Sequence, residues 1–128
     1  MELVELTFDA TNKPWFQPPS WVFGPVWTFL YATIGISFVL AYQNRDEIPT
    51  GAFLLFFIQL LANLTWSSFF NDADYASSIS IILVMLFASI GWAILIYPYN
   101  STASLLFVPY ILWVGFATII NVWYYLEA

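Results

Sequence analysis

Amide, hydroxyl and aromatic side chains recur at helical spacing within long apolar stretches of this sequence. Gln59, Asn63 and Ser67 follow one another every four residues, which places all three on one face of a helix. Trp66 and Phe70 stand beside this stripe at helical spacing. Unpaired polar groups are costly in an apolar medium, so such side chains face the interior of a helical bundle or a cavity. A few polar groups among aromatic rings are typical of a pocket for a flat, largely apolar ligand.

Two other stretches carry matching aromatic side chains. Trp27 and Tyr31 lie one helical turn apart, and Trp113, Ala117 and Asn121 form a further stripe with a spacing of four residues. A large ring beside an alanine leaves room for a flat ligand. These residues and the first stripe are therefore candidates for the lining of one aromatic pocket.

The residues alone also allow plainer interpretations. Gln59 and Asn121 are suited to joining helices by hydrogen bonds. The row of Thr33, Ser37 and Ala41 predicts close helix packing, either inside the chain or in a homodimer. Aromatic residues near the ends of spanning helices commonly form belts at the membrane interface, which fits Trp15, Trp21, Tyr42, Tyr97, Trp123, Tyr124 and Tyr125.

The composition excludes several kinds of chemistry. The sequence contains no His and no Cys, so it cannot build a zinc site, a Cys or His nucleophile, or a His or Cys axial ligand for haem. Two basic and eight acidic residues give a net charge of −6, which argues against nucleic acid as a partner. We therefore expect no catalytic residues, no metal ligands and no required cofactor.

The elements that must position these side chains are membrane helices. The sequence is 62% hydrophobic and 8% charged, far from the composition of soluble domains, and no charged residue occurs over 48–70 or 75–126. A helix that crosses a bilayer needs about 20 mostly apolar residues. Four segments qualify, and their short connections make neighbouring helices antiparallel: 21–42, 51–70, 76–97 and 102–126. The sequence therefore predicts one domain over residues 1–128, an all-α integral membrane protein built as a bundle of four transmembrane helices.

Three blocks of the sequence resemble the signature blocks of the TspO/MBR family, which comprises the tryptophan-rich sensory proteins of bacteria and the translocator protein of mitochondria. The blocks are KPWFQPPSWVFGPVWTFLY at 13–31, NLTWSSFF at 63–70 and VPYILWVGFATIIN at 108–121. They stand in the family's order and at family-like spacings. The similarity extends from about Phe8 to the end of the chain.

The resemblance implies a bundle of membrane helices around a pocket for tetrapyrroles, sterols and synthetic benzodiazepine-type ligands, usually in a homodimer. It also implies roles in porphyrin or sterol handling and in stress-linked regulation. The expected ligand is a porphyrin-type or haem-type tetrapyrrole. Matched motif by motif, the family's ligand-lining positions fall on Trp27, Tyr31, Asn63, Trp66, Ser67, Trp113 and Ala117.

The stretch rich in Pro and Trp before the first helix resembles the family's lid over the mouth of the pocket. Pro14, Pro18 and Pro19 have a fixed φ and no N–H, so this loop cannot become helical and loses little entropy when it is ordered. Trp15 and Trp21 are expected to anchor the lid to the bundle. The resemblance therefore predicts a rigid cover at the N-terminal arm, residues 1–20.

Two departures from the family pattern change what the resemblance implies. The family usually has five spanning helices, the first of which precedes the Lys-Pro-aromatic block, and here only twelve residues precede Lys13. We therefore expect that helix to be missing, which leaves one wall of the bundle open to a dimer partner, another protein or lipid. The C-terminal VWYYLEA has no basic residue, so it lacks the sterol-contact pattern of some members and sterol binding is not carried over.

The leading interpretation is a membrane protein that binds porphyrin-type tetrapyrroles for transport or stress-linked regulation. One alternative is an enzyme that degrades bound porphyrin in the light, with Trp27 and Trp113 as redox-active side chains. The lack of an acid–base pair in the apolar segments argues against it. Another alternative is an interaction subunit of a larger membrane complex that binds no ligand, and the expected open wall favours it.

Overall fold

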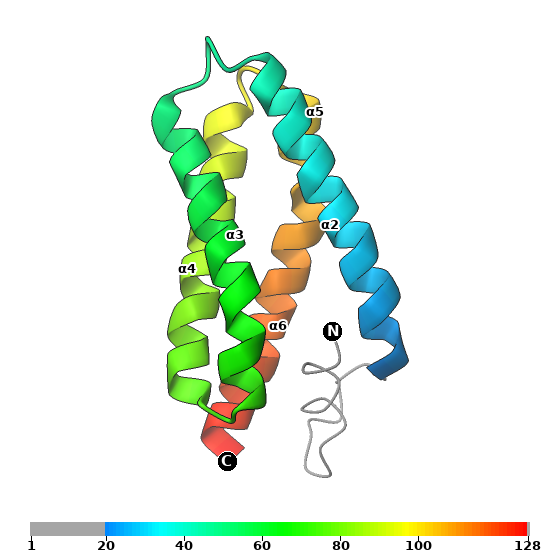
Figure 1. The fold of residues 1–128 in the computed structure, drawn as a ribbon, viewed down its shortest axis with the longest axis vertical. Helices are drawn as coiled ribbons and strands as arrows, with labels where there is room; N and C mark the ends of the chain where they lie inside the picture. The colour runs from blue at the N-terminus through cyan, green and yellow to red at the C-terminus, as the bar shows by residue number, and fades with distance from the viewer. Residues whose placement is uncertain (1–19, 128) are drawn as a thin grey trace.

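The computed structural model describes residues 20–127, which form helices joined by short connections (Figure 1). The helices are α2 (Ser20–Gln43), α3 (Thr50–Asn71), α4 (Tyr75–Ile96), α5 (Ser101–Leu105) and α6 (Val108–Glu127). Four stretches are long and apolar enough to cross a membrane: Gly24–Gln43, Thr50–Phe70, Tyr75–Ile96 and Ser101–Glu127. The predicted all-α bundle with four spanning segments is therefore confirmed for the described part of the chain.

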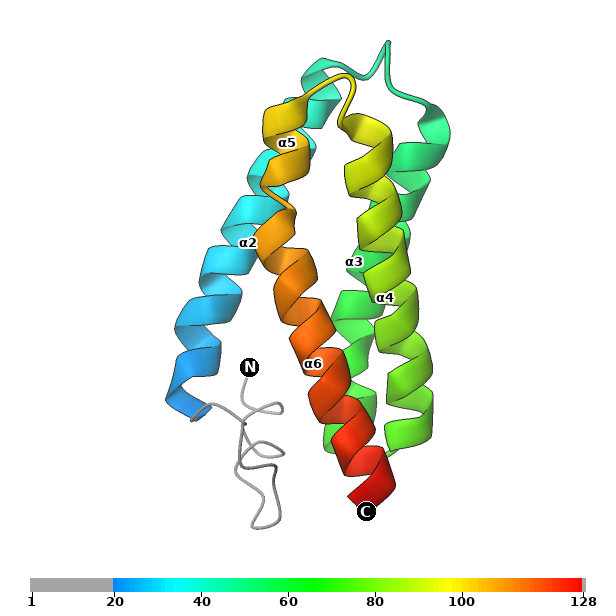
Figure 2. The same cartoon turned by 180° about the vertical axis from the view of Figure 1, so that it is seen from behind.

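The helices lie along one long axis, and successive spanning segments run in opposite directions (Figures 1 and 2). α3 packs closely against α4, α4 also packs against α6, and α2 packs against α5 and α6. α2 and α3 are joined at one end of the bundle and diverge toward the other end (Figure 1). The backbone of α2 is therefore held by α5 and α6 more than by α3.

The predicted fourth helix, 102–126, is divided into two helices. α5 ends at Leu105 and α6 begins at Val108. Pro109 has no N–H to donate, and its ring would clash with the carbonyl of Leu105 four positions earlier in a continuous helix. The chain therefore turns between the two helices, and the proline lies in the first turn of α6, where it is tolerated. The expectation of one continuous helix is wrong at this point, while the other predicted boundaries agree within one residue.

The turn between α3 and α4 is closed by backbone hydrogen bonds. The N–H of Asp74 donates to the carbonyl of Phe69 at 3.0 Å, a pattern that ends a helix with one residue in the left-handed conformation. Here that residue is Ala73, with a φ of 61°. The carboxylate of Asp74 accepts from the N–H of Ser77 at 3.3 Å and caps the start of α4. These bonds keep α3 and α4 antiparallel and close together.

At the opposite end of the bundle, Asn100 connects two separate loops. Its Oδ1 accepts from the N–H of Ala103 at 3.0 Å and caps α5. Its Nδ2 donates to Oδ1 of Asn44 at 3.1 Å and to the carbonyl of Leu40 at 3.3 Å. The end of α2 is therefore attached to the α4–α5 connection by side-chain hydrogen bonds.

Apolar side chains cover the outside of the bundle, while polar ones lie inside it. Leu61, Phe87 and Leu112 are 65%, 66% and 68% exposed, whereas Gln59 and Asn121 are fully buried. A soluble monomer rarely exposes so large an apolar surface, and lipid is the medium that suits it. The charged side chains of the described residues lie in the connections or at the last helix end: Arg45, Asp46, Glu47, Asp72, Asp74 and Glu127.

The row of Thr33, Ser37 and Ala41 is buried within the chain. The hydroxyl of Ser37 donates to the carbonyl of Ala103 at 2.7 Å and accepts from Nε1 of Trp92 at 3.2 Å. This row therefore serves the close packing of α2 inside the bundle.

Tyr124 is part of the core rather than of an interfacial belt. It is 4% exposed, and its ring is stacked on that of Tyr75 at a centroid distance of 5.4 Å. Tyr42, Tyr97 and Tyr125 are 50%, 55% and 52% exposed, as residues of a belt would be. The belt interpretation is therefore wrong for Tyr124, because the last turns of α6 pack on α3 and α4 through this ring.

Candidate functional site

Three of the predicted site residues form an aromatic cluster between α2 and α6. The ring of Trp27 lies 5.7 Å from that of Tyr31 and 6.4 Å from that of Trp113, centroid to centroid, and it meets Trp113 edge to face. Trp27 is buried, and the other two side chains are half-buried. Because Trp27 and Tyr31 are one turn apart, α2 presents both rings on the side that faces the bundle. Edge-to-face pairs of this kind are favourable beyond the area that they bury.

A chain of hydrogen bonds connects this cluster to the bundle interior. The hydroxyl of Tyr31 donates to Oδ1 of Asn63, which joins α2 to α3. Nδ2 of Asn63 donates to the hydroxyl of Tyr110 at 2.8 Å, and that hydroxyl donates to Oε1 of Gln59 at 2.8 Å. Asn63, Tyr110 and Gln59 are all buried. Neutral amide and phenol groups from α2, α3 and α6 therefore meet at one place.

Trp66 belongs to a second hydrogen-bonded group farther along α3. Its Nε1 donates to Oδ1 of Asn121 on α6 at 2.9 Å, and Nδ2 of Asn121 donates to the carbonyl of Tyr75 on α4 at 3.4 Å. The ring of Trp66 is stacked on Phe70 at 4.8 Å. This pair therefore joins α3, α4 and α6, in agreement with the interpretation of Asn121 as a residue that holds helices together.

The last two predicted site residues follow these clusters along their helices. Ala117 is 5% exposed and lies one turn after Trp113 on α6. Ser67 is half-buried and lies one turn after Asn63 on α3. Each therefore shares a helix face with a residue of the aromatic cluster or of the hydrogen-bond chain.

The combined arrangement offers flat apolar faces together with a few neutral hydrogen-bonding groups. Nε1 of Trp27 and Nε2 of Gln59 are buried and have no hydrogen-bond partner within the described residues. Buried donors without a partner are uncommon, and a ligand that carries acceptor atoms would satisfy them. Within residues 20–127, no group of three His, Cys, Asp or Glu side chains is placed to hold a metal ion. The site is therefore suited to binding a flat apolar molecule with polar substituents.

The predicted lid falls mostly outside the described residues, since Pro14, Trp15, Pro18 and Pro19 precede residue 20. Trp21 lies in the first turn of α2, and its side chain is 74% exposed.

The site residues predicted from the family motifs do not include Tyr110 and Gln59, although the structure bonds Tyr110 to Asn63 and Gln59 to Tyr110. Each is fully buried. A signal was present, because Gln59 belongs to the same four-residue stripe as Asn63, and Tyr110 precedes Trp113 by one helical turn. What the sequence could not show is that α6 turns Tyr110 toward this stripe.

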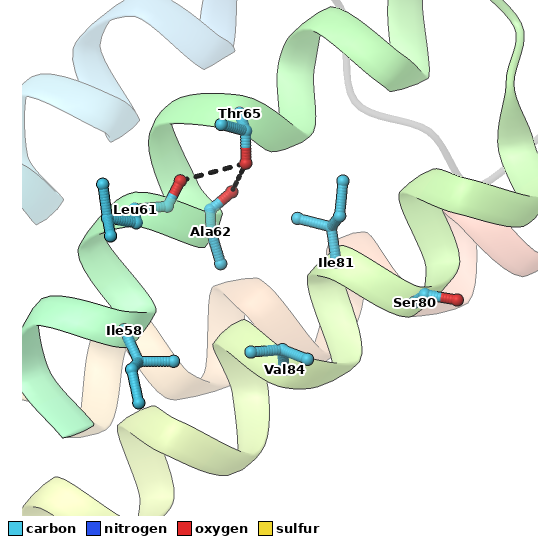
Figure 3. Close-up of a pocket in the computed structure, with 7 residues that line it drawn as sticks. All are labelled: Ile58, Leu61, Ala62, Thr65, Ser80, Ile81 and Val84. Carbon is cyan, nitrogen blue, oxygen red and sulfur yellow. Dashed lines mark hydrogen bonds between the residues drawn. The ribbon is translucent and has the colours of Figure 1, made fainter. Parts of the chain in front are cut away.

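A separate hollow of ≈ 490 Å³ lies between α3 and α4 on the outer surface of the bundle (Figure 3). Its wall includes Ile58, Ala62 and Val84, and most of it is apolar. The hydroxyl of Thr65 donates to carbonyls of its own helix at 3.0 and 3.2 Å, and that of Ser80 donates within α4 at 3.4 Å. The two hydroxyl groups of this hollow are therefore already satisfied, and nothing polar in it favours one ligand.

The fold and the site together define a multi-pass integral membrane protein with an aromatic, amide-containing interior. The sequence matches the model of the TspO/MBR family over residues 2–126. That match covers nearly the whole chain, and the protein therefore belongs to the TspO/MBR family.

Individual relatives agree with this assignment. The chain is 37% identical to the tryptophan-rich protein TspO of Archaeoglobus fulgidus, over 96% of this chain and 80% of the relative. It is 34% identical to the translocator protein homolog of Schizosaccharomyces pombe, over 91% of this chain and 74% of that protein. It is 30% identical to the human translocator protein, over 89% of this chain and 70% of the human protein. The similarity thus extends to archaeal, fungal and human proteins.

Proposed function

We propose that this protein binds porphyrin-type tetrapyrroles inside the membrane, for transport or for stress-linked regulation of tetrapyrrole levels. The observation that carries the proposal is the edge-to-face contact of Trp27 and Trp113 beside the Tyr31–Asn63 hydrogen bond. A macrocycle needs flat apolar surfaces for its ring and polar groups for its edge substituents, and this arrangement provides both. The names of the fungal and human relatives, which call them translocator proteins, favour transport.

The burial of the site indicates how a ligand would enter. Trp27, Asn63 and Ala117 are each 5% exposed, so a macrocycle needs the rings to separate before it can lie between them. The separation would move the N-terminal part of α2, which carries Trp27, away from α6 and Trp113. This part of α2 already diverges from α3 along the bundle (Figure 1). Binding would then replace the Trp27–Trp113 contact with contacts to the macrocycle.

Titration of the purified protein with protoporphyrin IX tests the proposal. Tryptophan fluorescence should be quenched saturably in detergent and in nanodiscs. Trp113→Phe keeps an aromatic ring but removes the larger indole face, and an aromatic contact is worth about 0.5–1.5 kcal/mol. The dissociation constant should therefore rise by roughly 2- to 10-fold.

Trp123→Phe is the matched control, because Trp123 is a half-buried residue of the same helix that packs against Tyr124 rather than against Trp27. It should lower the total fluorescence but leave the dissociation constant unchanged. Quenching that does not saturate, or equal dissociation constants for wild type and Trp113→Phe, would contradict the proposed site.

A further inference from the structure

Two hollows lie one after the other between α2 and α3. The first, of ≈ 350 Å³, is lined by Tyr31, Ile34, Gly35, Phe38, Phe56, Phe57 and Leu60. The second, of ≈ 430 Å³, is lined by Phe38, Tyr42, Arg45, Asp46, Thr50, Phe53 and Phe57. Phe38 and Phe57 line both hollows, so the two hollows are neighbours along the helices, and we call them together the α2–α3 groove.

The aromatic lining and the length of the groove suit a hydrocarbon chain. In its middle, the ring of Phe38 on α2 lies 4.9 Å from that of Phe56 and 5.7 Å from that of Phe57, centroid to centroid. From Tyr31 to Arg45 the groove extends for about 20 Å, at about 1.5 Å per helical residue. The hydrocarbon core of a bilayer is about 30 Å thick, and one leaflet accounts for about half of that thickness. The groove is therefore long enough for one acyl chain that starts at the membrane surface.

The end of the groove at the α2–α3 connection carries one positive and one negative side chain. The guanidinium carbon of Arg45 lies 4.5 Å from the centroid of the Tyr42 ring, and Nη1 donates to the carbonyl of Tyr42 at 3.1 Å. These contacts hold the guanidinium at the end of the groove and leave other N–H donors free. Asp46 lines the same end, and neither side chain forms an ion pair with another described residue.

We propose that the α2–α3 groove binds one phospholipid of the phosphatidylethanolamine type. The phosphate would lie at Arg45, the primary ammonium at Asp46, and one acyl chain would follow the groove past Phe38 toward Tyr31. Charge complementarity selects a zwitterionic headgroup, because an anionic headgroup would meet the carboxylate of Asp46 without a counter-charge. A primary ammonium can also donate hydrogen bonds to that carboxylate, which a quaternary ammonium cannot. The groove is distinct from the proposed tetrapyrrole site and shares only Tyr31 with it.

Native mass spectrometry of the full chain with two lipids of identical acyl chains tests the inference. The probes are palmitoyl-oleoyl phosphatidylethanolamine and palmitoyl-oleoyl phosphatidylglycerol. We expect the first to be retained about fivefold better, the factor that one charge contact near a membrane surface supplies. Asp46→Asn should abolish this preference, and Arg45→Gln should weaken the binding of both lipids. Glu47→Gln is the matched control, because Glu47 is the exposed acidic neighbour that does not line the groove.

A second pair of variants tests the hydrocarbon part of the site. A side chain added at Gly35 meets no atom within 4 Å at its Cβ, so Gly35→Leu is compatible with the helix and fills the groove. It should reduce the retention of both lipids, while Gly115→Leu on α6, where space is equally open, should not. Circular dichroism verifies that each variant is folded.

Three results would overturn the inference. The first is equal or better retention of the phosphatidylglycerol by the wild type. The second is undiminished lipid retention by Gly35→Leu. The third is a dimer in the same spectra that is lost in Gly35→Leu while lipid retention is unchanged. That result would mean that a second copy of the chain occupies the groove.

Discussion

Asn63 bonds α2 to α3 through Tyr31, in addition to the bonds that Ser37 of α2 forms with Trp92 and Ala103. Replacing Asn63 should separate the contribution of its hydrogen bonds from that of ordinary packing. Asn63 accepts a hydrogen bond from the hydroxyl of Tyr31 and donates one to that of Tyr110 at 2.8 Å. Asn63→Leu keeps nearly the same side-chain size and removes both bonds. Tyr31→Phe removes only the first of them.

The size of the effect follows from the number of bonds and from their surroundings. Interhelical hydrogen bonds in membranes contribute about 0.6 kcal/mol on average and about 1.7 kcal/mol at most. The two bonds between Asn63 and the tyrosine hydroxyls therefore amount to about 1–3 kcal/mol of unfolding free energy, and Tyr31→Phe should cost about 0.6 kcal/mol. The Tyr31–Asn63 bond is lost in each single variant and can be lost only once in the double variant. The double variant should therefore be destabilised by about 0.6 kcal/mol less than the sum of the two single variants.

Reversible unfolding in mixed micelles, followed by tryptophan fluorescence and circular dichroism, measures the four free energies of this cycle. A control cycle pairs Tyr31→Phe with Asn121→Leu, because Asn121 bonds to Trp66 and Tyr75 and not to Tyr31. The control cycle should be additive within about 0.3–0.5 kcal/mol. If the Tyr31–Asn63 cycle is equally additive, the hydrogen bond makes no net contribution and the reasoning about this network is refuted.

Three further substitutions test other parts of the fold by the same unfolding measurement. Trp66→Phe removes the 2.9 Å bond to Asn121, which should cost about 0.6–1.7 kcal/mol in addition to lost packing, and the hydrogen-bond part of the effect should disappear in an Asn121→Leu background. Ser37→Leu forces a larger side chain into a fully buried position and should cost about 1–3 kcal/mol, whereas a gain in stability would show that α2 does not pack through this row. Ala73→Gly relieves the positive φ of 61° at the end of α3 and should stabilise by about 1 kcal/mol; a destabilised variant would exclude the left-handed conformation there.

Much of the fold could be predicted from the sequence because a membrane imposes strong local requirements on a chain. Spanning helices need long uncharged runs, and these runs gave boundaries within one residue for the first three helices. The division of the last span into α5 and α6 was missed, although Pro109 is visible in the sequence. In the sequence, a proline that one continuous helix tolerates near its beginning cannot be distinguished from a proline at which a second helix begins. The structure shows the second case, with two turn residues between Leu105 and Val108.

For the candidate site, the four-residue stripes and the family blocks indicated which residues belong to the interior of the bundle. Helical periodicity was sufficient for this, because it places residues on a common face of one helix. It could not assign partners across helices. Only the tertiary structure shows Tyr31 bonded to Asn63, Trp27 against Trp113, and Trp66 bonded to Asn121.

The sequence by itself determined that this is a membrane-embedded helical protein of the TspO/MBR type with aromatic and amide residues inside. Uncharged length, helical spacing and three sequence blocks are properties of the chain that need no knowledge of how its helices meet. The tertiary structure decided that Tyr110 and Gln59 join the site and that Tyr124 belongs to the core. It also decided that an aromatic groove with Arg45 and Asp46 at its end runs between α2 and α3. These features depend on the rotation of each helix about its axis and on the divergence of α2 from α3, which are set by contacts between residues far apart in the sequence.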